Sequence, residues 1–105
     1  YAQGFVVFPG GFGTFDELFE ALTLVQTQKV TSFPVVLVGT KFWTPLVDWM
    51  RETVLAEDKI SPEDFNMIHI VDDVDEVISI LLSAEREREK AVNEWGILRG
   101  RRSRS

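Results

Sequence analysis

The chain has 105 residues, of which 45% are hydrophobic and 11% aromatic, enough apolar material for the core of one small domain. It contains no cysteine and a single histidine, which argues against a disulfide framework, a thiolate nucleophile and the usual zinc sites. No apolar run approaches the ~20 residues that span a bilayer, and the amino terminus lacks a signal-peptide pattern. We therefore expect a globular, cytoplasmic protein that binds neither a membrane nor a metal.

The formal net charge of −6 conceals an asymmetry. Four of the eleven basic residues lie among the last seven, so residues 1–98 carry seven basic and seventeen acidic residues, a balance of −10. No nucleic-acid partner is expected for such an acidic body, because that binding depends on basic side chains that displace counterions from phosphates. The basic tail RGRRSRS could contact phosphate, but a disordered, solvated chain end is the simpler interpretation.

Three apolar runs, each followed by a turn and an amphipathic stretch, give the chain the order βαβαβα. The runs are nearly continuous, as is typical of parallel strands covered on both faces. They are FVVF (5–8), PVVLVG (34–39) and MIHIV (67–71). We predict an α/β fold in which one parallel sheet with right-handed crossovers is flanked by helices.

Helical periodicity follows the first two strands. After the first strand, apolar residues at i, i+3, i+4, i+7 and i+10 run from Phe15 to Val25, and Gln26 projects into the middle of this stripe. A buried amide at that position would need hydrogen-bond partners. The second helix is expected to begin with Thr44 as its cap and Pro45 in its first position.

The third helix is expected to be entered through Asp72 or Asp73, with an apolar stripe from Val74 to Leu82. It continues into EREREK (85–90), which has no apolar face and should leave the globule. The predicted parts are a domain portion, a charged helical extension and a basic disordered tail, namely residues 1–84, 85–98 and 99–105. Three parallel strands leave two exposed sheet edges, so we expect a further part of the domain to precede this segment.

The turn between the first strand and the first helix is rich in glycine. Gly10, Gly11 and Gly13 let a ligand approach the backbone closely, and the helix that follows offers unpaired N–H groups and the positive end of its dipole. Such a turn binds phosphate without a lysine, and Thr14 adds a hydroxyl donor. The spacing fits neither the dinucleotide pattern G-x-G-x-x-G nor a P-loop. A plain strand-to-helix connection is the structural alternative.

Glu17 has two interpretations. Together with Thr14 it makes a T-x-x-E capping box, in which each side chain bonds to the backbone of the other residue. The residues alone favour this cap. Against it, the side chain of Glu17 projects roughly 100° or more away from the apolar stripe. It shares its face with Ala21, Leu24 and Gln28, and that half-apolar face suggests a second packing surface such as a partner subunit.

The segment PGGFGTFDE (9–17) resembles the PGGxGTxxE motif of the LONELY GUY family, the cytokinin riboside 5'-monophosphate phosphoribohydrolases, whose bacterial members were long labelled "possible lysine decarboxylase". The six motif positions are all present: Pro9, Gly10, Gly11, Gly13, Thr14 and Glu17. The chain is similar to the longer bacterial branch of this family through about residue 82. The resemblance implies a Rossmann-like nucleotide-binding fold and hydrolysis of the N-glycosidic bond of a nucleoside 5'-monophosphate to free base and ribose 5-phosphate.

By this resemblance, the 5'-phosphate binds to the turn at Gly10, Gly11, Gly13 and Thr14, and Glu17 stabilises the positive charge that develops on the ribose. Family members pair the glutamate with an arginine and a second glycine-rich segment from an upstream half, and these are expected to complete the enzyme. The alternative is a non-catalytic half-domain that binds nucleotide phosphate or mediates dimerisation. The resemblance also implies a homodimer or a higher homo-oligomer.

The remaining polar and aromatic residues have structural interpretations. Decarboxylation normally uses pyridoxal phosphate on a lysine, and no lysine lies beside the glycine turn in the sequence, so no cofactor is expected. His69 is expected to be a core histidine. Trp43 and Trp49 are expected to be packing residues, with stacking on a base as the alternative for an aromatic near a strand end. The acidic residues of segment 72–75 are explained as helix caps.

Overall fold

The structure, a computed structural model, describes residues 4–28 and 33–104, with side chains for residues 4–27 and 33–90. The strands β1 (Phe5–Val7), β2 (Val35–Val38) and β3 (Ile68–Val71) form one parallel sheet in the order β1-β2-β3. Phe5 pairs with Val35, which in turn pairs with Ile68. The predicted α/β class and the order βαβαβα are confirmed.

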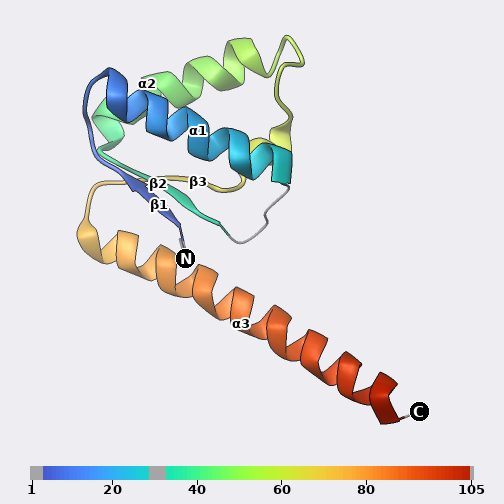
Figure 1. The fold of residues 1–105 in the computed structure, drawn as a ribbon. Coiled ribbons are helices and arrows are strands. Elements are labelled where there is room, and N and C mark those ends of the chain that lie inside the picture. Colours follow the sequence, from blue (N-terminus) through green and yellow to red (C-terminus); the bar gives the residue numbers. More distant parts are fainter. Residues whose placement is uncertain (1–3, 29–32, 105) are drawn as a thin grey trace.

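The helices lie on both faces of this sheet (Figure 1). α1 (Phe12–Gln28) and α2 (Thr40–Trp49) cover one face, and α3 (Val74–Arg104) crosses the other. Two successive crossovers of the same hand in a sheet ordered β1-β2-β3 place α1 and α2 on the same side. A π-helical turn, η1 (Met50–Val54), extends α2, and a 3-10 turn, η2 (Pro62–Phe65), precedes β3.

The larger hydrophobic core lies between the sheet and the pair α1 and α2. Leu18 and Trp43 are completely buried there, against Val35 and Leu37 of the central strand. The indole Nε1 of Trp43 donates a hydrogen bond to the carbonyl of Val38 at 3.1 Å, which fixes α2 to the end of β2. Trp43 is therefore a packing residue, as predicted.

The core under α3 is smaller. Val36, Val71 and Val77 are its buried members. The apolar stripe predicted for α3 is only partly covered, because the sheet beneath it has three strands: Val74 and Ile78 remain 65% and 49% exposed.

α2 begins earlier than predicted. Its first residue is Thr40, so Pro45 lies inside the helix and Thr44 is not its cap. The prediction was wrong because the carboxylate of Asp72, 32 residues away, accepts a hydrogen bond from the Thr40 N–H. A cap supplied from the end of another strand leaves no local signal in the sequence.

Two side-chain predictions were also wrong. Gln26 is exposed rather than buried, because its position faces η2, where its Nε2 donates to Oδ2 of Asp64 at 3.1 Å. Trp49 is 53% exposed at the end of α2 and is not a core residue.

α3 runs without interruption past the proposed boundaries at residues 84 and 98. Ala84 is the last buried side chain described on it, and the helix then extends beyond the sheet (Figure 1). The backbone of residues 99–104 is helical, where a disordered tail was expected. Of the helices described in the two ranges, none is long and apolar enough to cross a membrane.

Candidate functional site

The described helices α1, α2 and α3 begin at the same edge of the sheet. Each strand of a parallel sheet delivers the chain to its carboxyl end, where the next helix presents unpaired N–H groups and the positive end of its dipole. Ligands of open α/β sheets bind at this edge. The three helix starts differ in whether these groups are already satisfied.

The start of α2 is occupied by Asp72. Oδ1 of Asp72 accepts a hydrogen bond from the Thr40 N–H at 2.8 Å, and Oδ2 accepts one from the Thr40 hydroxyl at 2.9 Å. The preceding Gly39 donates its N–H to the Val71 carbonyl at 2.7 Å. An internal carboxylate therefore already lies where an anion would bind to α2.

The start of α3 is also capped by an aspartate. Oδ1 of Asp73 accepts hydrogen bonds from the N–H groups of Asp75 and Glu76, at 2.6 and 3.3 Å. This confirms Asp73 as the entry to the third helix and capping as the role of the two adjacent aspartates, although Asp72 serves α2 instead of α3.

The start of α1 has no such carboxylate. Its first turn contains no acidic residue, and the turn closes through a hydrogen bond from the Phe15 N–H to the Gly11 carbonyl at 3.2 Å. In the described part of the chain, no acceptor is bonded to the N–H groups of Phe12, Gly13 or Thr14. Of the three helix starts at this edge, α1 is the one that remains open to an external anion.

The glycines leave this start accessible. No described atom lies within 4 Å of the point where a Cβ would stand on Gly11 or Gly13. On Gly10, in contrast, a Cβ would come within 3.0 Å of the Cβ of Thr14 and closer still to its hydroxyl oxygen. The threonine side chain thus folds back over the turn, and its hydroxyl lies against Gly10.

The predicted capping box is wrong. α1 begins at Phe12, so Thr14 is the third residue of the helix and cannot be its cap. Within the described residues, the side chain of Glu17 makes no hydrogen bond to Thr14 or to any other group. The glycine turn begins the helix earlier than the T-x-x-E pattern indicates, and the carboxylate of Glu17 is left exposed.

Glu17 lies on the side of α1 that faces away from α2. The opposite side is marked by Phe15, whose ring stacks on Phe42 of α2 with centroids 6.1 Å apart, and two residues along a helix correspond to a rotation of about 200°. Glu17 is four residues beyond Gly13 and therefore lies on the same side as the open start. On this face Leu24 is 53% exposed, but Ala21 is buried within the chain.

His69 lies away from the carboxyl edge of the sheet. It is half-buried under α3, and burial lowers the pKa of its imidazole below the usual value. It lines a cavity of about 340 Å³ with Pro34 and Glu87, toward the amino ends of the strands. The prediction of a core histidine therefore holds only in part, because His69 is half-buried and belongs to neither hydrophobic core.

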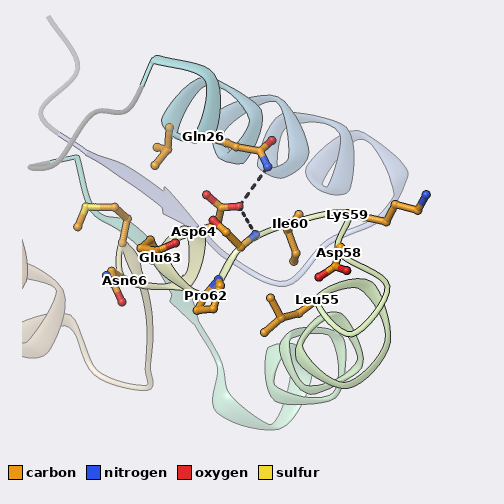
Figure 2. A pocket seen from close by; sticks show the side chains of 12 residues that line it. Gln26, Leu55, Asp58, Lys59, Ile60, Pro62, Glu63, Asp64 and Asn66 are labelled. Carbon is orange, nitrogen blue, oxygen red and sulfur yellow. Dashed lines mark hydrogen bonds between the residues drawn. The ribbon is translucent and has the colours of Figure 1, made fainter.

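A second cavity also lies away from the glycine turn. It has a volume of about 1090 Å³ and lies between the last turn of α1 and the segment from Leu55 to Met67, which leads into β3 (Figure 2). Oδ2 of Asp64 accepts hydrogen bonds from Gln26 Nε2 and from the Ser61 N–H, at 3.1 and 2.9 Å (Figure 2). Its central polar groups are thus paired with each other, and the cavity is remote from the open helix start.

The sequence model of a protein family described as "Possible lysine decarboxylase" matches residues 1–81. The match covers the whole sheet, the glycine turn and Glu17, and it ends within the part of α3 that packs on the sheet. No curated protein matches the chain.

Proposed function

The chain belongs to the LONELY GUY family, whose sequence model is described as "Possible lysine decarboxylase", and from this premise we propose that the protein is a nucleoside 5'-monophosphate phosphoribohydrolase. Its substrate is a purine or cytokinin nucleoside 5'-monophosphate, and its products are the free base and ribose 5-phosphate. The observation that carries the proposal is the open start of α1 with an unpaired carboxylate one turn further along the helix.

The 5'-phosphate binds at the glycine turn in this proposal. The N–H groups of Gly11, Gly13 and their neighbours donate to its oxygens, the Thr14 hydroxyl adds a side-chain donor, and the helix dipole favours its charge. Gly10 contributes by its lack of a Cβ, because a Cβ there would collide with Thr14. The phosphate thereby fixes the nucleotide at one end.

Glu17 acts on the sugar. When the bond from C1' to the base nitrogen breaks, the electron pair leaves with the base and positive charge develops on the ribose. A carboxylate at this point stabilises that charge and orients a water molecule, whose oxygen joins C1' while a proton passes to the base. The side chain has no hydrogen bond to lose first, since none joins it to another described residue.

The decarboxylase description is not the activity that we propose. Pyridoxal phosphate chemistry requires a lysine held toward the cofactor. The three lysines with described side chains, Lys41, Lys59 and Lys90, are all exposed. Lys41 does lie at the carboxyl edge, in the first turn of α2, which the sequence did not indicate.

The test is product release from AMP and from a cytokinin monophosphate, with the complete gene product as wild type, Glu17→Gln and Glu20→Gln. Glu20 is an equally exposed carboxylate on the same helix, so its variant controls for the change in charge. We expect Glu17→Gln to lower kcat by a factor of about 100 or more, and Glu20→Gln to retain wild-type turnover. Equal turnover in the two variants would contradict a catalytic role for Glu17.

A second candidate function is binding of nucleotide phosphate without turnover. It is favoured by the open start of α1, which can bind a phosphate without any contribution from Glu17. In that case phosphate would bind and no base would be released by any variant. The same assay, combined with a phosphate-binding measurement, separates the two candidates.

We also propose that the protein forms a homodimer or a higher homo-oligomer. Leu24 is exposed on the face of α1 that carries Glu17, so a partner bound there would lie beside the candidate site. Light scattering after size-exclusion chromatography should show an oligomer for the wild type and a smaller species for Leu24→Glu. A monomeric wild type would contradict this proposal.

A further inference from the structure

We propose that Asp72 is a specificity-determining residue, which restricts the candidate site to a single phosphate group. The inference rests on the proposed function and concerns the start of α2, where a second anion would otherwise bind. Asp72 acts by occupying that place with its own carboxylate.

The starts of α1 and α2 adjoin. Gly39, directly before α2, has a positive φ of 111°, and a Cβ on it would lie 3.3 Å from Cγ of Pro9, which begins the glycine turn. Two neighbouring helix starts with free N–H groups would together suit a pair of linked phosphates. Because the carboxylate of Asp72 occupies the start of α2, only the start of α1 is left to bind a phosphate.

The orientation of the bound nucleotide determines where a second phosphate would lie. The ribose must lie on the side of α1 that carries Glu17, and α2 packs on the other side, at Phe15 and Phe42. The second phosphate of a nucleoside diphosphate is attached to the first on the side opposite the ribose. It would therefore extend toward α2 and meet the carboxylate of Asp72.

Two like charges at this point repel each other, and two neighbouring donors are already bonded to Asp72 itself. The N–H and the hydroxyl of Thr40 both bond to Asp72. Lys41 follows in the same turn but is exposed, and it is present in every variant used to test the proposal. Nucleoside monophosphates are accepted for this reason, and diphosphates are rejected.

The test compares Asp72→Asn with Asp73→Asn, because both remove one negative charge from adjacent residues and both leave a side chain that can cap a helix. The amide introduced by Asp72→Asn can still accept from the Thr40 N–H and donate to its hydroxyl, so the fold should be retained. We expect the preference for AMP over ADP in kcat/KM to fall at least about fivefold in Asp72→Asn and to stay unchanged in Asp73→Asn. An unchanged preference in both variants would overturn the proposal.

Binding of inorganic phosphate and pyrophosphate, measured by calorimetry, gives a readout that is independent of turnover. Asp72→Asn should bind pyrophosphate more tightly relative to phosphate, and Thr40→Val, which keeps the carboxylate, should retain the wild-type ratio. If Asp72→Asn does not fold, Asp72→Ser removes the same charge and should shift the ratio likewise. A shifted ratio in a protein that hydrolyses no nucleotide would refute the proposed function alone, and an unshifted ratio would refute the role of Asp72 alone.

Discussion

The starts of α1 and α2 are alike in position and opposite in chemistry. Both follow a strand at the carboxyl edge, and a glycine precedes each of them. α2 receives the carboxylate of Asp72 from the end of the neighbouring strand, whereas α1 receives no carboxylate from any described residue. The difference teaches that glycine before a helix does not by itself leave the helix start open, because a carboxylate from another element can occupy it.

The largest change in stability and in phosphate binding is expected from Gly10→Ala, which alters the start of α1. The new Cβ would collide with the side chain of Thr14, within 3.0 Å of its Cβ, so either the helix start or the threonine must move. We expect the free energy of unfolding to fall by about 1–3 kcal/mol and phosphate binding to be lost. Urea denaturation and phosphate calorimetry measure the two effects.

Gly11→Ala is the matched control for stability, because no described atom lies within 4 Å of its new Cβ. It should leave the free energy of unfolding close to that of the wild type. If Gly10→Ala and Gly11→Ala were equally stable, the contact between the turn and Thr14 would not constrain α1.

A smaller effect is expected at the start of α2, from Gly39→Ala. The backbone of Gly39 has φ 111°, which a residue with a Cβ rarely adopts, and the Cβ would also press on Pro9. The expected loss in the free energy of unfolding is about 1–2 kcal/mol. Gly39→Asn should lose less than Gly39→Ala, because asparagine tolerates a positive φ better; the reverse order would show that the contact with Pro9, not φ, is decisive.

The smallest effect concerns His69, on the α3 side of the sheet. Burial lowers the pKa of its imidazole in the folded protein, so the unfolded chain binds a proton more readily. Stability should therefore fall as the pH drops below about 6.5, the usual value for histidine. Urea denaturation at pH 7.5 and 5.5 should show a smaller loss for His69→Gln than for the wild type, and an equal loss in both would exclude the imidazole as the cause.

The regular elements were largely predictable from the sequence. Near-continuous apolar runs located each strand to within about one residue, because strands covered on both faces have few polar positions. The glycine turn and Glu17 were also identified as candidate site residues, since they lie close together in the chain. Their assignment as phosphate site and catalytic carboxylate stays a prediction.

Interactions between distant segments were not predictable. The hydrogen bonds between Asp72 and Thr40 span 32 residues. Because of them, α2 begins at Thr40 and not at Thr44 and Pro45, where the sequence pattern predicted its start. The hydrogen bond of Gln26 with Asp64 spans 38 residues and replaced the expected burial of the amide. In both cases a side chain from another element decided the outcome, and no local pattern records that.

The most direct test of the central claim is an NMR titration of the ¹⁵N-labelled protein with inorganic phosphate. The claim is that α1, and not α2, offers the open anion site. We predict that the amide signals of Gly11, Phe12, Gly13 and Thr14 shift on binding, while those of Thr40 and Lys41 do not. Shifts centred on Thr40 and Lys41, or no shifts at the start of α1, would contradict the account.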